Sequence, residues 1–444
     1  MLNLRKSQSQ LRKYPFLSII LTFYMLIINN TTNSITSIIA ILLSLIFVFN
    51  PIYILPPLFI SSLLGDYFVA FRGIGLSRIM VIIFIVGSSL KFIKDSTKFE
   101  YNHIFLILII CGFNIISAIT SITGSIIPAL TMILNIIMMF FMMYTRIDDF
   151  DMFLKTFMYS LIIFSLYIMI IRISGDAVVI NDKGIDRLVM NEKLNSNRIG
   201  MALAQMTAFI YGGILLTKEK NKKTVYSIVL LINIVNLFFT GSRSAMIAII
   251  SSILIIYFIN LLKSKKIGKF FFSFLIISIL LAGLYFSVIN SNSGLISRFN
   301  ITNILETGGT GRAIIWKTLI KYVIPENLWF GVGLGGENVY NAVSTFVAIP
   351  NGTHNFLLTI IAQTGMIGFI LYLSFFLKST KIILKGYLDN DYLVIPLVMV
   401  LTSLINGIGE DIFTERFFWF GIGLGFIIIK NNILTLKKGV LTRC

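Results

Sequence analysis

The sequence predicts an all-α, polytopic integral membrane protein with about 12–14 transmembrane helices. Hydrophobic residues make up 57% of the 444 residues and charged residues only 13%, whereas a soluble domain averages about 25% charged residues. Mean hydropathy is +0.90. Apolar runs long enough to cross a bilayer recur along the chain, and a long polar segment, 290–353, interrupts them. These features indicate a helical membrane protein with one large loop.

A transmembrane helix needs about 20 apolar residues. The first apolar run follows a basic segment and lacks a small-residue cleavage site, so we expect a retained signal-anchor helix. Pro51, Pro56 and Pro57 interrupt the next two short runs. Two of these first three runs could therefore form a re-entrant or interfacial hairpin. The expected spans are 15–29, 35–50, 52–65, 76–92, 103–121, 126–144, 152–171, 199–217, 224–240, 244–262, 269–289, 354–377, 391–408 and 416–433.

Lysine distribution predicts the topology. With the N-terminus inside, most lysines fall in segments expected to face the cytoplasm, including 218–223 and 263–269. This bias follows the positive-inside rule, so we expect both termini in the cytoplasm and the loop 290–353 outside it. The formal net charge of +18 then reflects topology signals lying against anionic lipid. Nucleic-acid binding is not expected, because the sequence has no basic helix or aromatic-basic module.

We expect three regions along the chain. Residues 1–194 contain N-terminal transmembrane helices, residues 195–434 form a membrane domain that includes the loop 290–353, and residues 435–444 are a cytoplasmic tail. The two cysteines, Cys111 and Cys444, cannot supply a disulfide framework.

Three arginines on the expected outer face are candidates for binding an anion, because a planar guanidinium suits phosphate and carboxylate groups. Arg243 lies in a short turn between two apolar runs, where an unpartnered charge is costly. Arg312 follows the glycine-rich residues 307–311, whose backbone amides could converge on an anion. Arg198 precedes another span. Each of these arginines could instead form a salt bridge, and Arg198 could simply anchor a helix end at the interface.

Trp316 lies four residues after Arg312, on the same face of an amphipathic helix that should continue to Tyr322. We expect this helix to rest on the membrane surface, with the tryptophan at headgroup level. A glycine-rich run, 331–336, follows it in the same loop.

His354 begins an expected span at its outer end, and Gly365 and Gly368 follow 11 and 14 residues later. At 3.6 residues per turn these positions return to nearly the same face, so we expect a groove below His354 where a neighbouring helix approaches closely. Imidazole can serve as a general base or a hydrogen-bond donor near neutral pH. Helix capping or packing is the alternative. A single histidine provides no metal site, and no cofactor is expected.

Four motifs carry these candidates: Thr240-Gly241-Ser242-Arg243, Gly311-Arg312 with Trp316, Gly331-x-Gly333, and His354-Asn355 followed nine residues later by Gly365-x-x-Gly368. Together they resemble the bacterial O-antigen ligase and O-antigen polymerase superfamily. The resemblance covers residues 195–426. The histidine-asparagine-glycine spacing is fairly specific, and its combination with a large outer loop and an upstream Ser-Arg is more specific than any one part.

The resemblance implies a GT-C-like, metal-independent glycosyltransferase that inverts the sugar's anomeric centre. Its donor would be a glycan on undecaprenyl pyrophosphate. By matching motif positions, Arg243 and Arg312 would hold the pyrophosphate, and His354 would orient or deprotonate the acceptor hydroxyl. The resemblance does not identify the general base, which leaves the acidic segment 410–415 as an alternative source. Further contacts to the substrate are expected from Arg198, Trp316, Asn355 and Glu410.

The expected function is polymerisation of repeat units of a bacterial surface polysaccharide on the outer face of the cytoplasmic membrane. The expected partners are the lipid-linked donor, a glycan acceptor, the bilayer and a chain-length regulator. A ligase that transfers glycan to lipid A-core or protein shares the same motifs and stays open as the alternative. A transporter or flippase is disfavoured, because ionisable residues cluster at the expected outer boundary rather than at the midplane.

Overall fold

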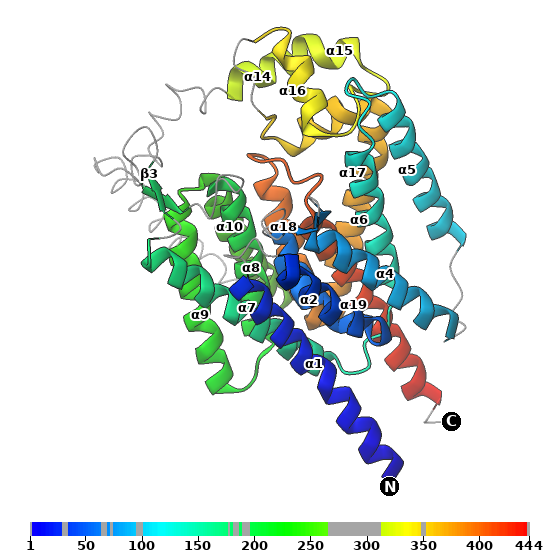
Figure 1. Ribbon diagram of the computed structural model, residues 1–444, viewed down its shortest axis with the longest axis vertical. Coiled ribbons are helices and arrows are strands. Elements are labelled where there is room, and N and C mark those ends of the chain that lie inside the picture. Colours follow the sequence, from blue (N-terminus) through cyan, green and yellow to red (C-terminus); the bar gives the residue numbers. More distant parts are fainter. Residues whose placement is uncertain are drawn as a thin grey trace.

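The computed structural model describes residues 2–28, 34–63, 69–71, 74–94, 101–175, 178–180, 186–188, 196–264, 312–347 and 352–441. These residues are mostly helices packed around a shared apolar core (Figure 1). The expected all-α membrane architecture is confirmed. The expected span 269–289 and the loop residues 290–311, including the glycines before Arg312, lie outside the described residues.

The N-terminal helices are α1 (Leu2–Ile28), α2 (Ser34–Leu45), η1 (Ile46–Phe49), η2 (Pro51–Ile54), α3 (Leu55–Leu63) and α4 (Leu76–Lys94). Asn50 leaves the helical conformation with a φ of −145°, and Pro51 begins η2. The Val48 backbone crosses α4 at Gly87, where an added Cβ would lie 2.7 Å from the Val48 carbonyl oxygen. The short proline-interrupted runs therefore fold as short helices packed closely on α4.

The middle of the chain forms α5 (Tyr101–Ile119), α6 (Ile127–Tyr144), α7 (Phe150–Ile173), α8 (Ser196–Leu216), α9 (Lys220–Thr240) and α10 (Arg243–Lys263). Among the long apolar helices that the structure describes, α8 is the most enclosed, with 83% of its apolar stretch buried, against 33% for each of α9 and α10. It packs against α9, α10 and α18. Gly212 permits close approach, because an added Cβ there would lie 2.9 Å from the Cα of Ile395.

Two short antiparallel hairpins are the only strands among the described residues. They pair β1 (Val69–Phe71) with β2 (Ile74–Gly75), and β3 (Val178–Ile180) with β4 (Asp186–Leu188). Strand β4 contacts α8 and α9. The hairpins lie in connections between helices and leave the helical architecture unchanged.

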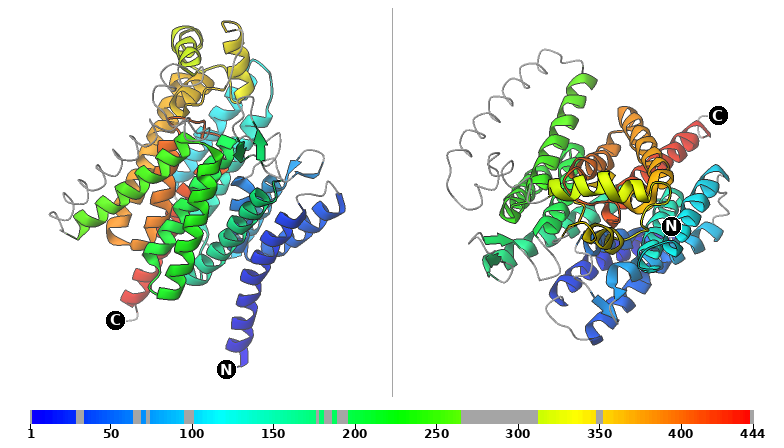
Figure 2. Two further views of the ribbon diagram at one scale, coloured as in Figure 1. Left: turned by 90° about the vertical axis from the view of Figure 1, so that its left-hand side faces the viewer. Right: turned by 90° about the horizontal axis from the view of Figure 1, so that it is seen from above.

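A small helical cap lies beyond one end of the bundle (Figures 1 and 2). It consists of α14 (Arg312–Thr318), the π-helical turn η4 (Leu319–Val323), α15 (Ile324–Glu326) and α16 (Gly336–Ser344). The cap has its own apolar cluster, which includes Leu319, Val323 and Val343. This cluster also contains Ala362 of α17, so the cap is packed onto the bundle rather than lying free on a surface.

The chain re-enters the bundle through α17 (Phe356–Asp389), η5 (Asp391–Leu393), α18 (Val394–Asn406) and α19 (Arg416–Leu441). Seven described helices are long and apolar enough to cross a membrane: α4, α6, α7, α8, α9, α10 and α17. Shorter apolar helices occupy the expected ranges near the N-terminus, at 105–119 and at 391–406. Helix α17 extends twelve residues beyond the expected end at 377.

The glycine at position 365 interrupts α17. Its φ of 62° is non-helical, and the helix hydrogen bonds lost there are replaced by the loop after α15. Val332 N donates to Ala362 O (2.9 Å), Gly333 N donates to Gln363 O (3.1 Å), and Met366 N donates to Leu328 O (2.7 Å). An added Cβ at Gly365 would lie 2.3 Å from a Trp329 backbone atom.

The kink corrects the expected role of Gly365. The regular helical repeat from residue 354 to residue 368 is broken, because residues 354 and 365 both have positive φ. At Gly365 the closest approach is made by an extended loop rather than by a neighbouring helix. At Gly368 an added Cβ would meet the side chains of Thr364 and of Phe113 in α5, so a neighbouring helix does approach closely there. The glycine-rich run 331–336 therefore holds the kink in α17 by backbone hydrogen bonds to Ala362 and Gln363.

Candidate functional site

The candidate site lies where the loop 407–415, between α18 and α19, meets the start of the cap. Gly407 N donates to Ser403 O (2.8 Å), and Gly409 N donates to Asn406 O (3.0 Å). Phe356 N, at the start of α17, donates to Gly407 O (2.7 Å). These backbone bonds fix the loop at the end of α18 that lies beside the entry to α17.

Glu410 is the centre of the site. Its carboxylate accepts a hydrogen bond from Arg312 Nη2 on Oε1 (2.8 Å) and pairs with His354 Nδ1 through Oε2 (2.9 Å). The Glu410 side chain is only 6% exposed, whereas those of Arg312 and His354 are 21% and 22% exposed. Arg312 Nη1 also donates to the Gly409 carbonyl (2.6 Å). One enclosed carboxylate thus joins a guanidinium to an imidazole, and both of these groups are partly exposed.

The backbone of His354 has an unusual conformation that packing alone would not require. Its φ is 45°, and it is the only non-glycine residue with positive φ among those described. Such a conformation costs roughly 1–2 kcal/mol and persists only where the surroundings over-determine it. In this conformation the imidazole of His354, two residues before α17 begins, contacts Glu410.

Residues on both sides of His354 hold this conformation. Asn355 caps α17, because its side-chain oxygen accepts a bond from Leu358 N (3.0 Å), and its Nδ2 donates to Ile408 O (3.2 Å). On the other side, the indole of Trp316 donates to the Thr353 carbonyl (2.7 Å). The Thr353 hydroxyl is also hydrogen-bonded to that of Thr359.

Trp316 makes a contact that the sequence did not indicate. Its indole N–H is directed at the backbone preceding His354, and α14 continues into the π-helical turn η4. Two apolar residues of this helix segment, Ile315 and Leu319, are buried in the cap cluster. Through this hydrogen bond Trp316 helps to hold the backbone before His354.

Arg243 is placed near the site by the next residue, Ser244, which packs on Gly409. Arg243 is the first residue of α10, and Ser242 lies before it in extended conformation. An added Cβ at Gly409 would lie 2.9 Å from Ser244 Cβ and 3.6 Å from Arg312 Nη1. Ser244 and Arg312 therefore both pack on Gly409. This places the start of α10, with Arg243, beside the Arg312–Glu410–His354 group.

Arg198 lies at the edge of this site. Its Nη2 donates to Glu415 Oε2 at 3.3 Å, a part-buried ion pair that ties the start of α8 to the loop before α19. The next residue, Arg416, is buried and donates to Asn135 Oδ1 (2.9 Å). Arg198 thus forms a salt bridge, which was one of its three sequence-based interpretations, and its partner Glu415 lies five residues beyond Glu410.

Asp411 has the most perturbed carboxyl near the site. Although part of its side chain remains exposed, surrounding protein atoms remove the carboxyl from water and raise its pKa to about 7. A hydrogen bond from Phe413 N (3.0 Å) opposes this change, whereas the nearby charge of Glu415 adds to it. Asp411 can therefore carry a proton at neutral pH.

The structure thus brings together Arg312, Glu410, His354 and Asn355, with Trp316 as support. Sequence reasoning expected Glu410 to contact the substrate but did not predict that it joins Arg312 to His354. It also missed the Gly409 carbonyl and the contact with Ser244. Two glycines flanking residue 408 were the available signal, since they permit a tight loop. Among the described residues no group of three or more His, Cys, Asp or Glu side chains could hold a metal ion.

Part of the chain is similar to a known protein family. Residues 227–373 match the family model described as O-antigen ligase. The match includes Arg243, Arg312 and His354, and it agrees with the resemblance carried by the sequence motifs. A search of curated proteins finds no match.

Proposed function

We propose that this protein, which carries an O-antigen ligase domain at residues 227–373, polymerises the repeat units of a bacterial surface polysaccharide. The donor is a glycan on undecaprenyl pyrophosphate, and the acceptor is a second lipid-linked glycan. The observation that carries the proposal is the Glu410 carboxylate, which binds Arg312 through one oxygen and His354 through the other. This arrangement joins an anion-binding group to a proton acceptor.

His354 is the proposed general base. A carboxylate facing Nδ1 favours the tautomer with its proton on that nitrogen, so that Nε2 keeps a lone pair. The imidazole is partly exposed, and Nε2 can therefore accept a proton from a sugar hydroxyl. Glu410 then stabilises the positive charge that forms on the ring, as carboxylates do in other histidine-dependent sites.

Arg312 and Arg243 are the proposed binding groups for the pyrophosphate. A guanidinium has five N–H donors, and the bonds to Gly409 and Glu410 leave further donors of Arg312 for a ligand. Arg243 begins α10, beside the same glycine, and the N-terminus of a helix also favours negative charge. Two such cations can stabilise a pyrophosphate leaving group.

The proposed reaction is a single displacement. The acceptor hydroxyl oxygen forms a bond to the anomeric carbon of the donor, and the bond from that carbon to the pyrophosphate oxygen breaks. The bonding electrons leave with the pyrophosphate, beside the arginines, and the hydroxyl proton moves to His354 Nε2. Attack opposite the leaving group inverts the anomeric centre.

We place this reaction at the outer face of the bacterial cytoplasmic membrane. In this arrangement residues 195–434 form the catalytic membrane domain, residues 1–194 add supporting helices, and both termini are cytoplasmic. The site groups all lie at one end of the bundle: α8 and α10 begin there, and α18 ends there. A chain-length regulator would act as a further partner.

The broken helix α17 does not favour the alternative of a transporter. Transporters commonly use unwound helix backbone to bind ions or substrate. In this protein the loop 328–333 takes up the backbone groups freed at Gly365 through hydrogen bonds. The kink is therefore satisfied by the protein itself and serves to position the entry to α17.

The test is polymer synthesis in cells whose own copy of the gene is replaced by variants. His354→Asn keeps a residue that tolerates positive φ but removes the base, which contributes roughly 10²–10⁴-fold in rate. Arg312→Lys keeps the charge but loses the planar fork. We expect both variants to be inserted normally and to accumulate lipid-linked single repeat units in place of long polymer.

Lys317→Gln is the matched control, because Lys317 is exposed on α14 and lies outside the site. It should make polymer of normal length. Wild-type polymer from both His354→Asn and Arg312→Lys would remove these residues from the chemistry. Long polymer that accumulates on its lipid carrier in either variant would instead identify the protein as a ligase.

A further inference from the structure

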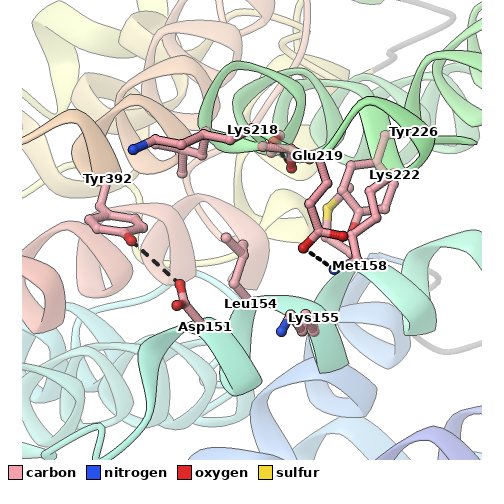
Figure 3. A pocket seen from close by; sticks show the side chains of 12 residues that line it. Asp151, Leu154, Lys155, Met158, Lys218, Glu219, Lys222, Tyr226 and Tyr392 are labelled. Atoms are coloured by element: carbon pink, nitrogen blue, oxygen red, sulfur yellow. Dashed lines mark hydrogen bonds and ion pairs between the residues drawn. The ribbon is translucent and has the colours of Figure 1, made fainter. Parts of the chain in front are cut away.

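A second polar pocket lies at the end of the bundle away from Glu410. It has a volume of about 300 Å³ and is formed where α7 begins, α8 ends and α9 begins (Figure 3). The candidate site lies beside the opposite ends of α8 and α9. Because α8 has 21 residues and each residue rises 1.5 Å, the pocket and the site are separated by about 30 Å.

Three ammonium groups and two carboxylates line this pocket. One ammonium and one carboxylate neutralise each other in an ion pair. Lys222 forms an ion pair with Glu219 one helical turn away. The hydrogen bond from Lys222 lowers the pKa of the Glu219 carboxyl below its ordinary value, so Glu219 is ionised at neutral pH. This pair contributes no net charge to the pocket.

The other two lysines are available to a ligand. Neither Lys155 nor Lys218 forms an ion pair within the part of the chain that the structure describes. Asp151, the remaining carboxylate, accepts a long hydrogen bond from the Tyr392 hydroxyl (3.4 Å). In Figure 3, Lys155 projects from α7 and Lys218 extends along the upper side of the same opening. The pocket therefore carries a net positive charge.

A neighbouring cavity of about 370 Å³ extends this surface and shares Leu216, Lys218 and Tyr392 with it. Beside this cavity the ammonium of Lys263 is already engaged, because it binds Asp391 (2.8 Å) and the Tyr387 carbonyl (3.0 Å). Lys218 therefore lines both cavities and can bind an anion in either one.

The pocket opens onto an apolar surface. Its inner wall includes Leu154, Met158 and Leu216. Further along the same helices, Tyr159 of α7 is 45% exposed and Ile228 of α9 is 54% exposed. A ligand that fills this site should combine an anionic head with a hydrocarbon tail.

We propose that this pocket binds the phosphate of an anionic membrane lipid between Lys155 and Lys218. The lipid tail follows the exposed apolar faces of α7 and α9. Basic pockets between transmembrane helices bind anionic headgroups at the cytoplasmic side, which is where the lysine distribution places this end of the bundle. The adjoining apolar faces favour a lipid over a soluble phosphate compound.

The test is lipid binding by the purified full-length protein, measured by native mass spectrometry during titration with phosphatidylglycerol. The double variant Lys155→Gln with Lys218→Gln should bind this lipid roughly thirtyfold more weakly, since each lysine near an anionic surface contributes about fivefold. The double arginine variant keeps both charges and should bind normally. Lys223→Gln is the control, because Lys223 is exposed on α9 but does not line the pocket.

Three results would overturn the proposal. The double glutamine variant could retain phosphatidylglycerol as well as the wild type. Lys223→Gln could weaken binding equally, which would indicate a general charge effect. Finally, millimolar inorganic phosphate could displace the lipid, which would identify a site for soluble anions.

Discussion

Replacing Glu410 by Gln should separate catalysis from folding more sharply than any other substitution in the site. Gln has the same shape, but its amide has one oxygen acceptor where the carboxylate has two. If that oxygen stays with Arg312, the amide NH₂ faces His354 Nδ1 and can only donate to it. The imidazole must then carry its proton on Nε2, so the nitrogen that faces the acceptor hydroxyl can no longer take a proton.

The expected loss of activity is large. General-base catalysis contributes roughly 10²–10⁴-fold, and a histidine held in the wrong tautomer loses up to about 10⁴-fold in a serine protease. The stability cost is smaller. A hydrogen bond to a charged group contributes about 1.5–3 kcal/mol, and the partial exposure of Arg312 and His354 reduces this to about 1–2 kcal/mol through solvent screening.

Polymer length on gels would report the activity of Glu410→Gln, and thermal unfolding in detergent would report its stability. Glu337→Gln is the control, because Glu337 is exposed on α16. A double variant with His354→Gln adds a second criterion. Substitutions of residues that act as one unit have non-additive effects on rate, so the double variant should be as active as the less active of the two single variants. Full-length polymer from Glu410→Gln at normal abundance would refute this reasoning.

Three further predictions address the fold, the pH dependence and the topology. Gly365→Ala should lower the unfolding temperature, because it places a side chain at a φ of 62° and against backbone, whereas Gly112→Ala, with open space around it, should not. The raised pKa of Asp411, about 7 against about 3.9 in an unfolded chain, means that the folded protein binds more protons. Stability should therefore fall as pH rises from about 4 to 7, and Asp411→Asn should flatten that slope in pH-dependent unfolding scans; an unchanged slope would contradict it. In a cysteine-free background, Ser344→Cys should react with an impermeant maleimide in intact cells and Lys223→Cys should not, and the reverse pattern would invert the topology.

The spans were predictable because the length of an apolar run limits what can cross a bilayer. The candidate residues at helix ends were predictable for a related reason, since charges near hydrocarbon stand out against their neighbours. Arg243 was chosen as a candidate in this way, whereas Arg312 was chosen for the glycine-rich residues before it and His354 for its place at the start of a span. Glu410 was also expected at the site, as a substrate contact. Its shared contact with Arg312 and His354 was not predicted, because Glu410 follows His354 by 56 residues.

The kink in α17 illustrates a second limit. A glycine within an apolar run is compatible with a regular helix, with a close helix contact and with a positive φ. The choice at Gly365 depends on the loop 328–333, which supplies replacement hydrogen bonds. Such long-range pairing leaves no local periodicity in the sequence, so the run 331–336 could be recognised as glycine-rich but not as a clamp on another helix.

The geometry around Glu410 also explains why an arginine and a histidine at separate positions can act as one site. Arg312 would bind the leaving pyrophosphate, and His354 would take the proton of the attacking hydroxyl. In the proposed reaction these events would occur on opposite sides of the reacting carbon, yet both groups contact the same enclosed carboxylate. Loss of either contact to Glu410 would therefore displace both Arg312 and His354. Because an unpaired enclosed carboxylate is costly, Arg312 and His354 each also help to keep Glu410 in position for the other.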